Sequence, residues 1–150
     1  MEIIVKPPIP DPPYSLHDAR VSAFQAEGDA LRLVMACGYV CTTEPCGQVD
    51  GDVEITGVDW ESSYVYVMDY PRVPCGNCGE FTGRKMTMEI FLAEYAGAPL
   101  EILDESCGYR AAKLSGFLDA GDRLLECTLD LYYTGEFRYL LKESRPLLDG

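Results

Sequence analysis

Apolar and polar residues alternate in short runs along most of the chain, with turn-forming residues between the runs. In the run over residues 31–41, Leu31, Leu33 and Met35 fall on one face of an extended strand, while Arg32 falls on the other. A period of two is the signature of a β-strand, in which successive side chains point to opposite faces. Both faces of this run are rather apolar, so each face needs a cover.

The dipeptide Gly28-Asp29 predicts a tight turn just before that run, because glycine accepts the positive φ that two-residue hairpin turns require. We expect residues 16–27 to fold back on residues 30–41 about this turn. The resulting register places Phe24 opposite Leu33.

A second hairpin is predicted from residues 53–59 and 63–70, with residues 60–62 at its tip. The remaining short runs of apolar, β-branched and aromatic residues predict four more strands. These strands cover residues 100–103, 112–118, 123–133 and 137–141.

Residues 87–95 fit two interpretations. Met88, Phe91 and Leu92 would line one face of a helix, whereas Met88, Ile90 and Leu92 would line one face of a strand. We favour the strand because the neighbouring segments are strands.

Together these patterns predict an all-β fold, a single-domain sandwich or flattened barrel of eight or nine mainly antiparallel strands. One short helix is added if residues 87–95 are helical. The β-rich domain spans residues 16–150. Residues 1–15 form an extended proline-rich arm, since five of residues 7–13 are proline.

The chain of 150 residues carries 25 acidic against 12 basic side chains, a net charge of −13. Binding to a nucleic-acid backbone rests on clustered Lys and Arg, so this charge disfavours it. The charge suits docking onto a basic partner protein, and a homo-oligomer stays open. The alternative is an acidic surface that merely keeps the protein soluble.

No run approaches the roughly 20 apolar residues that a membrane span needs. Residues 1–8 also lack the basic-then-apolar layout of a secretory signal, so we expect a cytoplasmic protein without a membrane partner. Seven cysteines in such a chain are expected to be reduced thiols, metal ligands or core residues rather than a disulfide framework.

Cys75 and Cys78 stand in a glycine-flanked turn, and a pair with this spacing supplies half of a tetrahedral zinc site. In the second predicted hairpin, antiparallel pairing brings position 46 close to position 77, so Cys46 and nearby Cys41 would lie at the same open end. We therefore predict a structural zinc ion bound by Cys41, Cys46, Cys75 and Cys78. The alternatives are free loop thiols or an adventitious disulfide. Cys107 is expected to be a loop or strand-edge thiol of no evident role.

Acidic residues also occur as close pairs, namely Asp50 and Asp52, Asp59 and Glu61, and Asp104 and Glu105. Such pairs would suit acid–base chemistry in a hydrolase. In so acidic a chain they are also expected as solvated turn residues. The only histidine, His17, is expected to be partly buried and hydrogen-bonded, and the chain shows no nucleophile motif.

Tyr64, Tyr66 and Tyr70 share one face of the strand predicted over residues 63–70. Tyrosine combines a large apolar area with a polar tip and is enriched in interfaces. This row is therefore the candidate partner-binding surface. Its alternative is ordinary cross-strand aromatic packing.

The order of Leu16-His17-Asp18-Ala19-Arg20-Val21 and Gly28-Asp29-Ala30-Leu31 resembles that of small bacterial β-rich proteins of uncharacterised or immunity-protein type. Those proteins tend to open with a His-Asp strand followed by a Gly-Asp-x-Leu hairpin. The resemblance implies a small bacterial β-rich protein and assigns no site residue.

The sequence thus predicts a non-enzymatic module that binds another protein, in the manner of an immunity protein or inhibitor. One alternative is a zinc-stabilised β scaffold whose cysteine-rich loops over residues 41–78 form a recognition surface. The other alternative is a hydrolase that uses the paired carboxylates.

Overall fold

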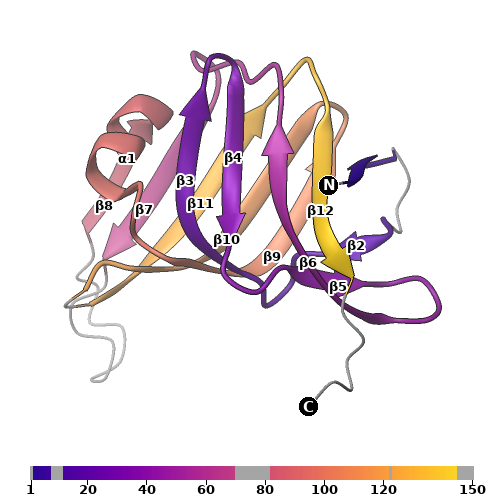
Figure 1. The fold of residues 1–150 in the computed structure, drawn as a ribbon. Coiled ribbons are helices and arrows are strands. Elements are labelled where there is room, and N and C mark those ends of the chain that lie inside the picture. The colour runs from indigo at the N-terminus through magenta and orange to yellow at the C-terminus, as the bar shows by residue number, and fades with distance from the viewer. Residues whose placement is uncertain (1, 8–11, 70–81, 122, 145–150) are drawn as a thin grey trace.

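The computed structural model describes residues 2–7, 12–69, 82–121 and 123–144 and shows a chain built almost entirely of strands (Figure 1). The strands are β1 (Glu2–Val5), β2 (Tyr14–Ser15), β3 (Arg20–Glu27), β4 (Ala30–Met35), β5 (Tyr39–Cys41), β6 (Gly47–Ile55), β7 (Tyr64–Asp69), β8 (Thr82–Thr87), β9 (Leu100–Gly108), β10 (Ala111–Asp119), β11 (Leu124–Tyr132) and β12 (Phe137–Ser144). One helix, α1 (Met88–Tyr95), follows β8 directly. The predicted all-β class is confirmed. The predicted eight or nine strands are too few, because the sheet holds twelve.

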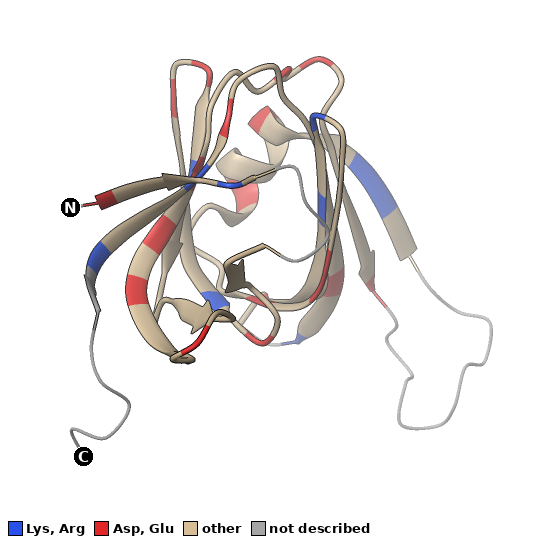
Figure 2. Cartoon of the chain, turned by 90° about the vertical axis from the view of Figure 1, so that its right-hand side faces the viewer, with Lys and Arg blue, Asp and Glu red and all other residues tan. Residues whose placement is uncertain are grey.

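All twelve strands belong to one sheet, and every pairing among the described residues is antiparallel. Its order is β1-β12-β6-β4-β3-β9-β10-β11-β7-β8, and β2 joins through β5, which pairs with β6. The sheet curls on itself, as the view in Figure 2 shows, so that one face of each long strand points inward. Alternating residues on those strands are buried, which is the expected consequence of a period of two.

The first predicted hairpin is confirmed over β3 and β4, but it is shorter than predicted, because residues 39–41 form β5 and pair with β2 and β6 instead. β3 and β4 pair about the turn at residues 28 and 29, and Phe24 lies opposite Leu33 as predicted. Gly28 has a φ of 62°, which is the left-handed conformation that the turn demands. The hairpin therefore owes its register to local turn chemistry.

The second predicted hairpin is wrong. β6 pairs with β4, β12 and β5, whereas β7 pairs with β11 and β8. Residues 56–63 therefore connect two separate regions of the sheet instead of forming a hairpin tip. Backbone hydrogen bonds hold this connection in place, since Val58 N donates to the carbonyl of Asp29 at 2.8 Å and Asp59 N to that of Tyr132 at 2.8 Å.

The strand favoured for residues 87–95 is also wrong, because residues 88–95 form α1. Thr87 ends β8 and caps the helix, its hydroxyl accepting a hydrogen bond from Ile90 N at 3.3 Å. The helix contacts β3, β7 and β8. Its fully buried Phe91 packs edge-on against Phe24, with 5.1 Å between the ring centroids. α1 thus covers a part of the core that the sheet leaves open.

Part of the predicted N-terminal arm pairs into the sheet. β1 lies along β12 at one end of the sheet, and Lys6 N continues this pairing by donating to the carbonyl of Phe137 at 2.7 Å. Further along the arm, β2 pairs with β5. The arm lies along the domain, which is the placement that its extended conformation allows.

Candidate functional site

The outward side of β10, β11 and β7 forms a broad exposed surface, which we call the outer face. Inward residues of these strands, such as Leu129 and Val65, are fully buried, so the residues between them point to solvent. At its centre the hydroxyls of Ser115 and Thr128 lie 3.1 Å apart on neighbouring strands. The edge strands of the sheet are β1 and β8, so β10, β11 and β7 each have a neighbour on both sides. The outer face therefore presents side chains rather than unpaired backbone groups.

Two of the three tyrosines predicted to bind a partner lie on the outer face. Tyr64 and Tyr66 are half-buried on β7, and Tyr70 lies outside the described residues. Lys85 from β8 covers the Tyr64 ring, with its Nζ 4.1 Å from the ring centroid. The ammonium is 5.9 Å from the Tyr66 centroid. This cation–π contact explains why the tyrosine rings are only partly accessible.

The most exposed apolar side chains of the outer face were not predicted from the sequence. Phe117, Leu124 and Tyr132 are 43%, 64% and 46% exposed. A sequence signal for them does exist, because each belongs to an apolar doublet within a strand. Phe117 precedes Leu118, and Leu124 precedes Leu125. Adjacent strand residues point to opposite faces, so one member of every such doublet must face outward.

Carboxylates surround these apolar side chains. Glu126 lies in register between Met68 and Phe117, and Asp130 between Tyr64 and Lys113. Two further acids, Glu101 and Asp104, lie opposite Phe117 and Ser115 on β9. Among the described residues no ion pair is seen for these four carboxylates. The outer face thus combines accessible apolar area with uncompensated negative charge.

Most basic side chains lie in ion pairs elsewhere, and these pairs concentrate the excess negative charge on the remaining acids. Examples are Arg84 with Glu94 at 2.9 Å, Arg20 with Asp119 at 3.8 Å, and Arg138 with Glu136 at 2.7 Å. Red segments recur on strands and turns in Figure 2, while blue segments are few. Among the described residues, the acids outside these pairs therefore carry the excess negative charge.

The four predicted zinc ligands fall into two groups. Cys75 and Cys78 lie outside the described residues. Cys41 ends β5, and Cys46 immediately precedes β6. The hairpin that was to bring the two groups together is absent, and the loop between β5 and β6 lies across the molecule from the end of β7 (Figure 1). Within the described part of the chain, no three metal-ligating side chains gather at one point.

Zinc binding stays a prediction that metal analysis can test directly. If the four thiolates form the predicted structural site, protein purified with a reductant and without chelators will hold about one zinc ion per chain. The double substitution Cys75→Ser with Cys78→Ser should abolish the zinc, and Cys107→Ser should leave it unchanged. A content far below one in the wild type would contradict the predicted site.

Of the paired carboxylates, Asp104 and Glu105 are separated by the sheet. Asp104 and Glu105 point to opposite faces of β9, and Glu105 lies 3.4 Å from Lys6 Nζ. Asp59 accepts a hydrogen bond from Ser62 N at 3.3 Å in the turn before β7. These contacts give Glu105 and Asp59 structural partners, which does not favour a hydrolase that uses them.

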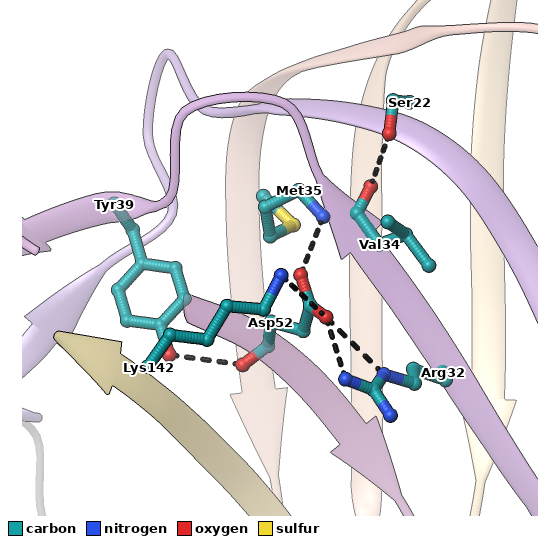
Figure 3. A network of polar contacts seen from close by, with 7 residues as sticks. All are labelled: Ser22, Arg32, Val34, Met35, Tyr39, Asp52 and Lys142. Atoms are coloured by element: carbon teal, nitrogen blue, oxygen red, sulfur yellow. Dashed lines mark hydrogen bonds and ion pairs between the residues drawn. The ribbon is translucent and has the colours of Figure 1, made fainter. Parts of the chain in front are cut away.

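Asp52 is the one fully buried acid among the described residues, and it lies in a polar network that joins four strands, β4, β5, β6 and β12 (Figure 3). Its Oδ2 accepts hydrogen bonds from Arg32 Nη2 at 2.8 Å and Nε at 3.2 Å, and lies 3.4 Å from Lys142 Nζ. Its Oδ1 accepts from Met35 N at 2.9 Å, and its carbonyl accepts from the Tyr39 hydroxyl at 2.9 Å. With every acceptor occupied from within the protein, the network holds β4, β5, β6 and β12 together.

His17 lies in the loop between β2 and β3, where its side chain is largely exposed rather than partly buried. Its Nδ1 lies 2.6 Å from the carbonyl oxygen of Leu103, and its Nε2 lies 3.5 Å from Asp18. The expected hydrogen bond is therefore present. The ring positions a loop against β9.

Comparison of the chain with protein-family models, curated proteins and solved structures finds no match. No helix of the described residues is long and apolar enough to cross a membrane. A functional assignment must therefore rest on the surface chemistry.

Proposed function

We propose that the protein is a non-enzymatic module that binds a basic partner protein through the outer face of β10, β11 and β7. In this view the curled sheet acts as a flattened barrel whose outer side carries the recognition surface. The observation that carries the proposal is the exposed apolar set of Phe117, Leu124 and Tyr132 beside unpaired carboxylates. Apolar anchors supply interface affinity, and the charges around them supply partner selection and association rate.

A basic partner fits this surface better than an acidic or neutral one. Glu126 and Asp130 flank the apolar side chains in register, and Lys113 and Lys85 are the basic residues nearest to them on the sheet. Like charges brought together across an interface are costly, so this arrangement selects against acidic surfaces. An inhibitor or immunity role, in which an acidic module blocks a basic enzyme, is one concrete form of the proposal.

The test begins with affinity capture from cells that naturally express the chain. The wild type is compared with the double variant Phe117→Ser and Leu124→Ser, and with Ile90→Ser as a matched control. Ile90 is 45% exposed on α1, close to the 43% of Phe117, but it lies away from the outer face. A basic protein retained by the wild type and by Ile90→Ser, and lost by the double variant, is the expected result.

Binding kinetics with that purified partner then separate the contribution of the apolar side chains from that of the carboxylates. Phe117→Ser should weaken binding by about tenfold or more, mainly through faster dissociation. Glu126→Gln with Asp130→Asn should instead slow association and flatten its dependence on salt. Equal binding by the double variant and the wild type, or an association rate of the wild type that does not change with salt, would contradict the proposal.

A further inference from the structure

A cavity of about 710 Å³ opens between the end of β1 and the connections at the ends of β9 and β11. Its lining includes the aromatic residues Tyr109, Tyr133 and Phe137, the cations Lys6 and Arg110, the carboxylate of Glu136 and the thiol of Cys107. A cavity of this size can admit a small molecule. It is separate from the outer face, because its lining comes from strand ends and loops.

The thiol that lines this cavity, Cys107, is hydrogen-bonded to a lysine. Lys6 Nζ donates a hydrogen bond to Cys107 Sγ at 2.8 Å, and its other acidic contact is Glu105 at 3.4 Å. The ammonium also lies over the Phe137 ring, 4.8 Å from the centroid. The Lys6 side chain is only 9% exposed, whereas Cys107 is exposed to solvent. A nearly buried cation therefore faces a sulfur atom that a solute can reach.

Lys6 keeps its proton in this setting. Burial acts to lower the pKa of Lys6, but the hydrogen bond to Cys107 and the charge of Glu105 outweigh that effect and raise the pKa above its ordinary value. The ammonium thus stays charged and is a permanent hydrogen-bond donor beside the sulfur. The thiolate form of cysteine is the nucleophile, and neighbouring lysines are among the groups that favour it.

The other described cysteines lack such a partner. Cys127 is buried in the core, and burial raises the pKa of its thiol to about 12. The thiols of Cys41 and Cys46 donate to the carbonyls of Thr43 and Thr42 at 3.6 and 3.7 Å. Cys37 is exposed without a lysine beside it. Cys37 therefore serves as an internal reference for Cys107.

We propose that Cys107 is a redox modification site that small peroxides oxidise selectively, with Lys6 as the proton donor. The Cys107 thiolate attacks one oxygen of the peroxide, a new S–O bond forms, and the O–O bond breaks. Lys6 gives a proton to the departing oxygen, so hydrogen peroxide leaves as water, and Lys6 regains its proton from solvent. Cys107 is oxidised to a sulfenic acid and the peroxide is reduced, which balances electrons and protons.

The experiment treats the reduced full chain with hydrogen peroxide at fixed pH, traps sulfenic acid with dimedone, and measures each cysteine by peptide mapping. Cys107 is expected to react about tenfold faster than Cys37. Lys6→Met, which keeps an apolar stem against Phe137, should bring the Cys107 rate down to that of Cys37. Arg84→Met removes a cation that pairs with Glu94, away from the cavity, and should change neither rate.

A second variant guards against the case in which Lys6→Met merely displaces β1. Glu105→Gln weakens the contact between Lys6 and β9 but keeps the Lys6 ammonium, which then has Cys107 as its remaining acidic partner. The oxidation rate of Cys107 should therefore equal or exceed the wild-type rate. Equal rates for Cys107 and Cys37 in the wild type would overturn the proposal. A fall in Glu105→Gln as large as that in Lys6→Met would also overturn it, since strand packing rather than proton donation would then set the rate.

Discussion

Replacement of Gly116 by alanine is expected to lower the free energy of unfolding by about 3 kcal/mol, a large fraction of the stability of a small domain. A Cβ atom built at Gly116 would lie 1.8 Å from the carbonyl oxygen of Glu101 and 2.8 Å from its carbonyl carbon. These are backbone atoms, so no side-chain rotation can relieve the clash. The strand β9 itself must move.

The position of Gly116 makes that movement costly. The pairing of β10 with β9 shifts register between Ser115 and Gly116, so a bulge already occupies this point. Glu101 also pairs with Arg20 in the short contact between β3 and β9, which has only two paired positions. That contact joins the two halves of the sheet. A displaced Glu101 would therefore weaken the link through which the whole sheet is continuous.

Urea unfolding measures the effect, with Gly47→Ala as the matched control. Gly47 begins β6, and a Cβ atom there would meet nothing within 4 Å. The control should lie within about 0.5 kcal/mol of the wild type. If Gly116→Ala were as stable as Gly47→Ala, the close approach of β9 to Gly116 would be incorrect.

This close approach is also an example of what the sequence could not predict. The β3–β4 hairpin was predictable, because Gly28-Asp29 and the alternation around Phe24 fix the turn and the register locally. The absence of a side chain at Gly116 has no local signature. It matters only because another strand, distant in the chain, passes over that residue.

The order of the strands in the sheet could not be predicted for the same reason. β6 and β7 are consecutive strands with good alternation, which is why a hairpin between them was predicted. β6 instead pairs with β12, where Phe137 lies opposite Ile55, more than 80 residues earlier in the chain. Such pairings are decided by the total burial of apolar faces, which no local window of sequence contains. The geometric premise of the zinc site failed with that hairpin.

The candidate binding surface was predicted in part. Tyr64 and Tyr66 do face outward on β7, as their alternation with valines required. The more exposed Phe117 and Leu124 were not predicted, because each precedes a leucine in an apolar strand and alternation alone does not say which of the two residues faces outward. For α1, the threonine cap at residue 87 outweighed the strand character of the neighbouring segments.

The second large effect is expected at Asp52, where substitution by alanine should cost about 2 to 3 kcal/mol of stability. The change leaves the buried N–H of Met35 without its acceptor and removes the shared partner of Arg32 and Lys142. Because those cations are 35% and 45% exposed, water can compensate them in part, which keeps the cost below that of a fully buried charge pair. Asp52→Asn retains an oxygen for Met35 N and should lose about half as much.

Two measurements make this prediction specific to the network. Asp50→Ala, on the same strand, is expected to stay within about 0.5 kcal/mol of the wild type, since Asp50 makes no ion pair among the described residues. A double-mutant cycle of Asp52→Ala with Arg32→Met should show a coupling energy of about 1 kcal/mol or more, because the two side chains share two hydrogen bonds. Strict additivity would mean that the Arg32–Asp52 pair has no part in holding β4 to β6, and that the loss comes from the contacts of Asp52 with Met35 N and Lys142.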